Sequence, residues 1–284
     1  MAAAPDVGRI ESMAAHMRRD IVEMLAQAGS GHPGGSLSAA DIIATLYFGV
    51  MRHDPARPDL PDRDRFVLSK GHAAPVLYAA LAEAGYFGGE HLATLRQLGS
   101  ILQGHPDSKK TPGVEVSTGS LGQGLSIANG IALGLRADGN AARVYCLLGD
   151  GEMQEGQVWE AAMLAAHYRL DSVTAIVDRN GLQIDGACED VMSLGDVEAK
   201  LGAFGWNVIG CDGHDVEALL AAFSGAAATS GVPSAIVART VKGRGVSFME
   251  NNADWHGKCT NEDQTRCALD ELACVLAKED AADV

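Results

Sequence analysis

The stretch Gly-Asp-Gly-Glu-Met-Gln-Glu-Gly at residues 149–156, together with Asn180, decides the fold of this chain. The apolar run 143–148 predicts a buried strand just before it, and apolar residues at helical spacing in 155–169 predict a helix just after it. A glycine turn between a strand and a helix N-terminus allows backbone N–H groups to face a phosphate. The sequence therefore predicts an anion-binding turn here.

Asp150 adds a carboxylate to this turn, and a carboxylate repels a bare phosphate. The conflict disappears if a divalent cation lies between them, and oxygen ligands of this kind suit Mg²⁺ or Ca²⁺ rather than zinc. The run 172–178 predicts the next strand, and Asn180 follows it closely. Because neighbouring strands of a parallel sheet end at one edge, we expect the amide oxygen of Asn180 beside Asp150.

Strands alternate with helices along the chain, which predicts an α/β fold with a mostly parallel sheet and helices on both faces. We also expect a helix at 90–98, and Ser38 at the start of another helix with Asp41 as its capping partner. No internal repeat or domain boundary is evident. We expect a single domain over residues 7–284, with frayed termini at 1–6 and 279–284.

Composition and net charge exclude some classes of binding partner. The 284 residues are 47% hydrophobic, and the net charge of −15 at pH 7 argues against nucleic acid or an anionic membrane as a partner. Six cysteines form no Cys-x-x-Cys pair, residues 1–6 do not resemble a signal peptide, and no apolar run reaches membrane-spanning length. These features predict a cytoplasmic location.

Histidines recur in glycine-containing loops. Four of them stand beside a glycine in separate loops: His32, His72, His105 and His256. Histidine exchanges protons near neutral pH, so the four together indicate proton transfer, although any one of them alone could be structural. The others occupy helical or surface contexts and are expected to be structural: His16, His53, His91, His167 and His214.

The spacing of Gly-Asp-Gly, twenty-eight residues and then Asn resembles the signature of thiamine diphosphate enzymes, and the whole chain resembles transketolase. The further matching motifs, in the order of that family, are Ser-Gly-His-Pro-Gly-Gly at 30–35, Leu-Ser-Lys-Gly-His at 68–72, Gly-His-Pro at 104–106, the glycine-rich loop at 112–124 and His-Gly at 256–257. The loop at 112–124 is more specific than the 149–156 motif. It separates transketolases from decarboxylases and oxo-acid dehydrogenases that share the cofactor.

The resemblance implies a thiamine diphosphate-binding fold and a role for each motif. The implied metal ligands, for Mg²⁺ or for Ca²⁺ or Mn²⁺ in its place, are Asp150, Asn180 and the carbonyl of Leu182. The residues implied to hold the diphosphate besides the metal are Gly151, His72 and His256. The residues implied to contact the organic rings are Gly119 and Leu121 at the aminopyrimidine and Ile184 at the thiazolium.

The resemblance also implies the catalytic residues, which are His32, His105, His256 and Glu155. Glu155 is expected to link paired active sites through a carboxylate network, and is also counted among the cofactor-binding residues. Lys242 and Trp255 are expected to approach the site or only to pack its loops. Arg244 is expected either to help hold the diphosphate or to lie on the rim.

The implied reaction moves a two-carbon ketol unit from a ketose phosphate to an aldose phosphate, a step of carbohydrate metabolism in the pentose phosphate pathway. A complete transketolase is more than twice as long and continues into a pyrimidine-binding domain and a C-terminal domain, which nothing here matches. The chain begins at Met1 and ends in an acidic tail. We therefore expect a split transketolase, in which this chain pairs with a separate C-terminal subunit, with two copies of each.

Two alternatives stay open at this point. The first is a transketolase-like subunit that acts on an unusual sugar, such as a branched or sulfonated ketose phosphate. The second is a non-catalytic cofactor-binding module, which is expected to have lost metal ligands or loop histidines. The retained Asp150, Asn180 and loop histidines argue against the second alternative.

Overall fold

The computed structural model of the chain describes residues 5–282, with side chains described as far as residue 274. A five-stranded sheet forms its centre, and all neighbouring strands in the order β1-β2-β3-β7-β6 are parallel. The expected α/β fold with a mostly parallel sheet is therefore confirmed. The strands are β1 (Arg65–Leu68), β2 (Val144–Gly149), β3 (Val173–Arg179), β6 (Asn207–Asp212) and β7 (Ser234–Arg239).

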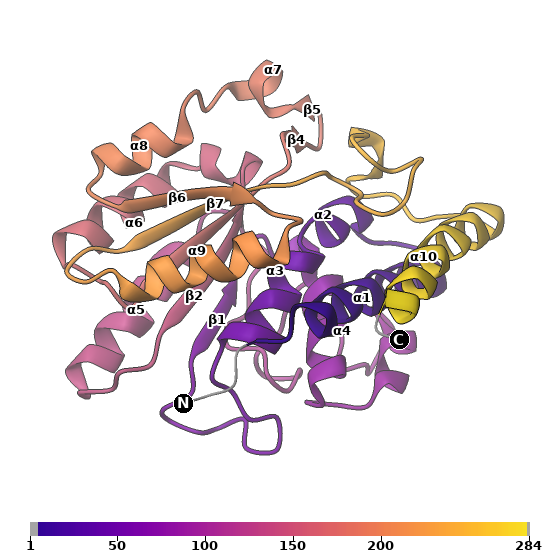
Figure 1. Ribbon diagram of the computed structural model, residues 1–284, viewed down its shortest axis with the longest axis horizontal. Coiled ribbons are helices and arrows are strands. Elements are labelled where there is room, and N and C mark those ends of the chain that lie inside the picture. Colours follow the sequence, from indigo (N-terminus) through magenta and orange to yellow (C-terminus); the bar gives the residue numbers. More distant parts are fainter. Residues whose placement is uncertain (1–4, 283–284) are drawn as a thin grey trace.

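Helices cover both faces of the sheet, as expected (Figure 1). One core contains side chains of α1, α3, α4 and α9, and the other contains side chains of α5, α6 and α8. The helices are α1 (Val7–Ala28), α2 (Pro33–Ser38), α3 (Ala40–Thr45), α4 (Ala74–Ala84), α5 (Gly124–Ala137), α6 (Gly156–His167), α7 (Cys188–Met192), α8 (Val197–Ala203), α9 (Val216–Ala228) and α10 (Glu262–Ala282). The shorter elements are η1 (Leu46–Val50), η2 (Gly71–Ala73), η3 (Gly89–Thr94), η4 (Gly151–Gln154), η5 (Ala253–Trp255), β4 (Leu182–Gln183) and β5 (Gly186–Ala187).

The side chains of β2 alternate between the two cores. Tyr145 and Leu147 belong to the core under α1 and α9, whereas Cys146 and Leu148 belong to the core under α5 and α6. A strand that is covered on both faces reads as one continuous apolar run, which explains why the sequence predicts it. Each large buried apolar side chain stabilises the fold by roughly 1.5–3 kcal/mol.

Both ends of the described chain are helical. Asp6 begins α1 by accepting a hydrogen bond of 3.1 Å from the N–H of Arg9, and α10 continues to Ala282. Residues 1–4 and 283–284 of the expected frayed termini lie outside the described residues. Between positions 5 and 282, no helix combines the length and the apolar character that crossing a bilayer requires.

The helix expected at 90–98 is wrong in extent. Only the short 3₁₀ segment η3 forms, and the chain then turns at Arg96, whose φ is 63°, and at Gly99, whose φ is 85°. Both lie in the left-handed region, which an α-helix does not visit. The N–H of Arg96 donates to the carbonyl of Leu102 at 2.9 Å, which closes the turn just before Gly104 and His105.

Candidate active site

The predicted side-chain metal ligands lie together where β2 and β3 end. The carboxylate of Asp150 accepts hydrogen bonds from the N–H of Gly151 at 2.8 Å and from the N–H of Gly181 at 2.6 Å, one on each oxygen. The amide oxygen of Asn180 accepts one from the N–H of Leu182 at 3.1 Å. Each of these oxygens has a second lone pair, so each can still bind a cation.

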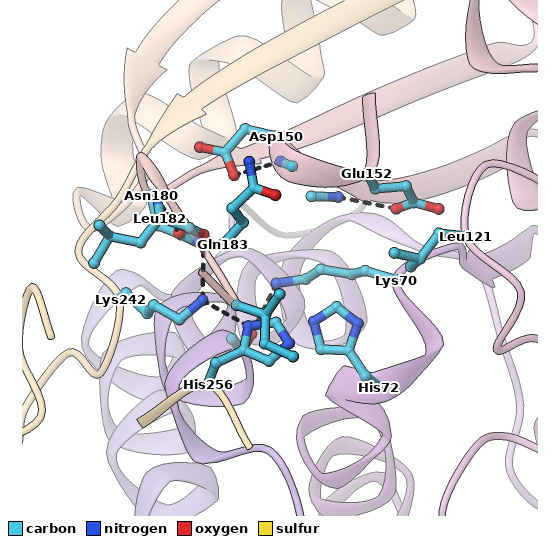
Figure 2. A pocket seen from close by; sticks show the side chains of 14 residues that line it. Lys70, His72, Leu121, Asp150, Glu152, Asn180, Leu182, Gln183, Lys242 and His256 are labelled. Carbon is cyan, nitrogen blue, oxygen red and sulfur yellow. Dashed lines mark hydrogen bonds between the residues drawn. The ribbon is translucent and has the colours of Figure 1, made fainter. Parts of the chain in front are cut away.

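A cavity of about 210 Å³ opens beside these oxygens (Figure 2). It lies at the carboxyl edge of the sheet and is lined by Gly35, Lys70, His72, Leu121, Gly149, Asp150, Gly151, Glu152, Asn180, Leu182, Gln183, Ile184, Lys242 and His256. Burial, followed by the charge of Asp178, raises the pKa of the Asp150 carboxyl. A cation in the cavity would offset both effects.

A buried polar atom at the cavity that has no partner among the described residues indicates that the cavity suits a polar ligand. This atom is Nε2 of Gln183, which lines the cavity. Figure 2 shows the Gln183 side chain reaching toward Asp150 at the cavity. A buried polar atom without a partner costs roughly 1–3 kcal/mol, which a bound ligand can recover.

Within residues 5–282, no group of three or more His, Cys, Asp and Glu side chains could hold a metal ion alone. Asp150, Asn180 and the Leu182 carbonyl supply three oxygens, whereas Mg²⁺ takes six and commonly completes its shell with water and substrate phosphates. The donor set therefore fits a cation shared with a bound phosphate group. That is the combination which Mg²⁺ and thiamine diphosphate would bring.

Two buried lysines flank the cavity. Lys70 is 1% exposed and pairs with the carboxylate of Asp178. Lys242 is 2% exposed, donates from Nζ to the carbonyl of Leu182 at 3.2 Å, and has Nζ 3.0 Å from Nδ1 of His256. Burial, followed by the charge of Lys70, lowers the pKa of Lys242 to about 8. The sequence did not decide whether Lys242 approaches the site or only packs its loops. The structure places its ammonium in the cavity wall.

Asp178 joins several elements below the cavity. Its fully buried carboxylate accepts hydrogen bonds from Lys70, from the Thr240 hydroxyl, from the Ser38 hydroxyl at 2.6 Å and from Nδ2 of Asn180 at 3.3 Å. An ionised carboxylate only accepts, so the nitrogen of the Asn180 amide faces it. The amide oxygen is thereby left for the metal site.

The capping role expected for Ser38 is wrong. Ser38 is the last residue of α2, and its hydroxyl bonds to Asp178 instead of starting a helix. Asp41 pairs with Arg18 and His214. Ser38 and Asp41 thus both bond to buried partners from other elements, and local helix signals do not reveal such contacts.

Glu152 fixes the glycine-rich loop against the end of β2. Its buried carboxylate accepts hydrogen bonds from the N–H of Gly122 at 2.9 Å and from the N–H of Gly149 at 3.0 Å. The Ser69 hydroxyl also donates to it, so the ends of β1 and β2 and the loop share one acceptor. The sequence pattern does not reveal this role, although Glu152 stands inside the deciding motif.

The four loop histidines form one cluster. The ring centroid of His32 lies 5.3 Å from that of His72, 5.5 Å from that of His256 and 6.5 Å from that of His105. Burial is the main cause that lowers their pKa values, to about 4 for His32 and His256 and about 2 for His72, with a smaller decrease for His105. All four are therefore neutral at pH 7, with one nitrogen able to accept a proton.

Other predicted residues are placed differently. Glu155 is exposed and does not line the cavity, whereas Ile184 lines it with 66% of its surface exposed. Gly119 is not among the residues that line the cavity and lies beside Gly71, since a Cβ on Gly71 would stand 2.7 Å from its backbone nitrogen. Leu121 lines the cavity directly.

Two residues left open by the sequence lie away from the cavity. Arg244 lines a separate hollow with Asp41 and His214, and its guanidinium is 3.7 Å from the carboxylate of Glu250. Trp255 is 4% exposed, and its ring centroid lies 5.2 Å from that of Phe248. In this chain Trp255 therefore packs the loop, and Arg244 stands apart from the cavity.

Arg96 belongs to none of the sequence motifs, yet it lies near the histidine cluster. A Cβ on Gly104 would lie 3.2 Å from Nε of Arg96, which places the exposed guanidinium beside the loop that carries His105. The charge of Arg96 contributes to the lowered pKa values of His32 and His105, after burial. Its left-handed φ cannot be recognised in a sequence that suggests a continuing helix.

Comparison with known proteins shows the family to which this chain belongs. A family described as transketolase, thiamine diphosphate binding domain, matches residues 10–275. The chain belongs to the transketolase family. The transketolase of Campylobacter jejuni has a solved structure that superposes with a TM-score of 0.87 at 33% identity, over 93% of this chain and 42% of that one.

Relatives of two lengths are found in the family. The 6-deoxy-6-sulfo-D-fructose transketolase subunit of Clostridium sp. (strain MSTE9) is 44% identical over 256 residues, which are 90% of this chain and 93% of that protein. An apulose-4-phosphate transketolase subunit of Phocaeicola vulgatus is 41% identical over 94% of this chain and 95% of that protein. Human transketolase is 43% identical over 94% of this chain but only 43% of its own length. The chain thus spans less than half of the longer transketolases.

Proposed function

We propose that this chain is the diphosphate-binding subunit of a thiamine diphosphate-dependent transketolase that transfers a two-carbon ketol unit from a ketose phosphate to an aldose phosphate. The observation that carries the proposal is the meeting of Asp150, Asn180 and the clustered loop histidines at one edge of the sheet. Oxygen ligands and neutral histidines side by side suit a metal-anchored anion next to proton transfer.

In this proposal Mg²⁺ is held by the side-chain oxygens of Asp150 and Asn180 and by the Leu182 carbonyl. The diphosphate is held by the metal and by Gly151, His72, His256 and Lys242. Gly119, Leu121 and Ile184 contact the rings of the cofactor. When bound, the cofactor supplies the electron sink for carbon–carbon bond cleavage.

The histidines are proposed to move protons on substrate hydroxyls. His32 is central, because its ring is close to those of both His105 and His256, at 6.5 and 5.5 Å between centroids. A neutral imidazole can take a proton at one nitrogen and give one from the other. These three residues could therefore serve different hydroxyls of one sugar without moving.

A separate C-terminal subunit is proposed to complete the site, with two copies of each chain. Ile184 is 66% exposed beside the cavity and Glu155 is exposed next to Gly122 of the glycine-rich loop, so both are available to a covering chain. The relatives of similar length are named as subunits, which supports this arrangement. The test is to purify this chain alone and measure ketol transfer. We expect no turnover until the partner is added, and robust transfer without a partner would refute the split arrangement.

An unusual sugar is the second candidate for the substrate. Relatives that match this chain nearly end to end include proteins named for 6-deoxy-6-sulfo-D-fructose and for apulose 4-phosphate. Arg96 lies exposed near His105 and could meet a terminal phosphate or sulfonate. A panel of ketose donors and aldose acceptors, assayed with the reconstituted pair, distinguishes a sulfonated or branched sugar from ordinary ketose phosphates.

A non-catalytic module is the remaining alternative, and the intact set of predicted ligands and histidines at the cavity argues against it. The proposed setting is cytoplasmic carbohydrate metabolism, including the pentose phosphate pathway. The cysteines, all of which are free in the structure, are consistent with a reducing compartment.

A further inference from the structure

A hydrogen-bonded series of side chains leads from α1 to the residue before Lys242. Arg18 on α1 bonds to both carboxylate oxygens of Asp41 on α3, with Nη1 3.0 Å from Oδ1. The other carboxylate oxygen lies 2.6 Å from Nδ1 of His214, in the loop between β6 and α9. The N–H of Val241 then donates to Nε2 of the same ring at 2.8 Å. The side chains of Asp41 and His214 are each only 10% exposed.

These contacts determine where the imidazole proton lies. A backbone N–H can only donate, so Nε2 of His214 must accept from Val241 and cannot carry a proton. The ring therefore carries its proton on Nδ1 and donates it to Asp41. Burial raises the pKa of Asp41, but the charge of Arg18 and the hydrogen bonds from His214 and Arg18 outweigh it and bring the pKa down to about 2. Asp41 is thus an ionised acceptor at neutral pH.

The segment from Thr240 to Gly243 carries Lys242 into the cavity wall and is held at its two ends. The Thr240 hydroxyl donates to Asp178, and the N–H of Gly243 donates to the carbonyl of Gly34 at 3.0 Å. His214 holds the residue between Thr240 and Lys242. The three anchors come from β3, from α2 and from the loop after β6.

We propose that His214, fixed as the Nδ1–H tautomer by Asp41, is the positioning residue that places Lys242 in the cofactor cavity. The sequence assigned His214 only a general structural role. The link to the diphosphate rests on the proposed function, because Lys242 is assigned there as a diphosphate contact. The tautomer and the backbone anchor do not depend on it.

Position matters here because Lys242 is a buried ammonium with two polar neighbours. Its Nζ contacts the Leu182 carbonyl and Nδ1 of His256, so a shift of the backbone would remove it from both. Electrostatic interactions fall with distance and are strong where solvent is excluded. Loss of the His214 anchor should therefore weaken the binding of a diphosphate more than that of an uncharged ligand.

The first test uses the unliganded chain. Nitrogen-15 NMR of the His214 ring should show Nδ1 protonated and Nε2 unprotonated, and the Val241 amide should exchange slowly with solvent. His214→Leu should speed that exchange, whereas His214→Gln, whose side-chain oxygen can accept the same hydrogen bond, should restore protection. A proton on Nε2, or unchanged exchange in His214→Leu, would overturn the inference. This result is independent of any cofactor binding.

The second test measures binding of thiamine diphosphate with Mg²⁺ to the reconstituted pair of subunits, by calorimetry in a double-mutant cycle. His214→Leu should weaken binding about tenfold in the wild-type background, and it should have no effect when Lys242 is already Met, because coupled residues do not add. The exposed His167→Leu serves as the control and should bind like the wild type. Additive losses in the double variant would show that His214 acts elsewhere. Absence of binding by the wild type, with the tautomer confirmed, would count against the proposed function instead.

Discussion

The ammonium of Lys242 donates a hydrogen bond of 3.2 Å to the backbone carbonyl of Leu182, the oxygen that we assign to the metal. A buried positive charge therefore stands where a divalent cation needs a ligand. Two positive charges beside one oxygen repel each other strongly when solvent is excluded. Binding of the cation requires Lys242 to turn away, and the diphosphate gives it an anion to turn toward. Metal and cofactor should bind together.

Lys242→Met separates these two effects. Without the ammonium, Mg²⁺ alone should bind the empty site more tightly, whereas thiamine diphosphate with Mg²⁺ should bind about tenfold less tightly, because a charge-assisted hydrogen bond contributes roughly 1.5–3 kcal/mol. Calorimetry with Mg²⁺ alone and with both ligands measures each change. The exposed Lys109→Met should alter neither. A variant that weakens both affinities equally would contradict the competition between Lys242 and the cation.

Gly71→Ala should damage the site by displacing the loop that contains Gly119. An added Cβ would stand 2.7 Å from the backbone nitrogen of Gly119 and 2.8 Å from the Thr118 hydroxyl oxygen, and backbone atoms cannot yield cheaply. We expect a loss of thiamine diphosphate affinity of about tenfold or more and an unfolding free energy lower by about 1–3 kcal/mol. Gly130→Ala is the matched control, since its Cβ would meet nothing within 4 Å.

The stability of the unliganded chain should fall on mild acidification. Burial lowers the pKa of His256 to about 4, whereas an unfolded histidine titrates near 6.5. Between these two values the unfolded chain binds more protons than the folded chain, so the free energy of unfolding rises with pH across this window. The stability that neutral His256 contributes is therefore lost as the pH falls from about 6.5 to about 4. Urea denaturation at several pH values measures the slope.

A variant that cannot titrate isolates this contribution. His256→Gln should show a shallower dependence of unfolding free energy on pH between about 4 and 6.5 than the wild type. The control is His167→Gln, whose histidine is exposed and should leave the slope unchanged. Identical slopes for all three proteins would mean that His256 does not titrate as its buried environment implies.

Arg96→Leu should impair recognition of charged substrates by the reconstituted pair. The protein has a net charge of −15, so an anionic sugar needs a local cation near the histidines. We expect the KM for a phosphorylated or sulfonated ketose to rise about tenfold, with kcat/KM for an uncharged ketose little changed. Arg266→Leu, whose side chain is 68% exposed and pairs with Asp263, is the control. An equal loss for charged and uncharged sugars would contradict this role.

The sequence predicted the sheet and the meeting of Asp150 with Asn180, because buried parallel strands read as apolar runs and share one edge. It also predicted the loop histidines, whose rings the structure brings within 6.5 Å of His32. Local sequence patterns are enough to predict these features, because each motif contributes one side chain to the carboxyl edge of the sheet. The assigned roles of these residues stay predictions until ligands are bound.

The sequence did not predict the buried charges that hold the site together. Lys70 and Asp178 pair across the ends of β1 and β3, 108 positions apart, and Glu152 accepts hydrogen bonds from an N–H of the glycine-rich loop and from one at the end of β2. Such pairings depend on tertiary contacts that no local spacing encodes. Likewise, the sequence predicted only a structural role for His214. Its contacts with Asp41 and Val241 join different elements of the fold, so no local pattern reveals them.

The central claim is that a Mg²⁺ ion at the ends of β2 and β3 anchors the diphosphate of thiamine diphosphate. The most direct measurement is a crystal structure of this chain, with its partner subunit, grown with both ligands. The account predicts a cation coordinated by the side-chain oxygens of Asp150 and Asn180 and by the Leu182 carbonyl, in contact with the diphosphate. A cofactor bound elsewhere, or no density bridging those strand ends, would contradict it.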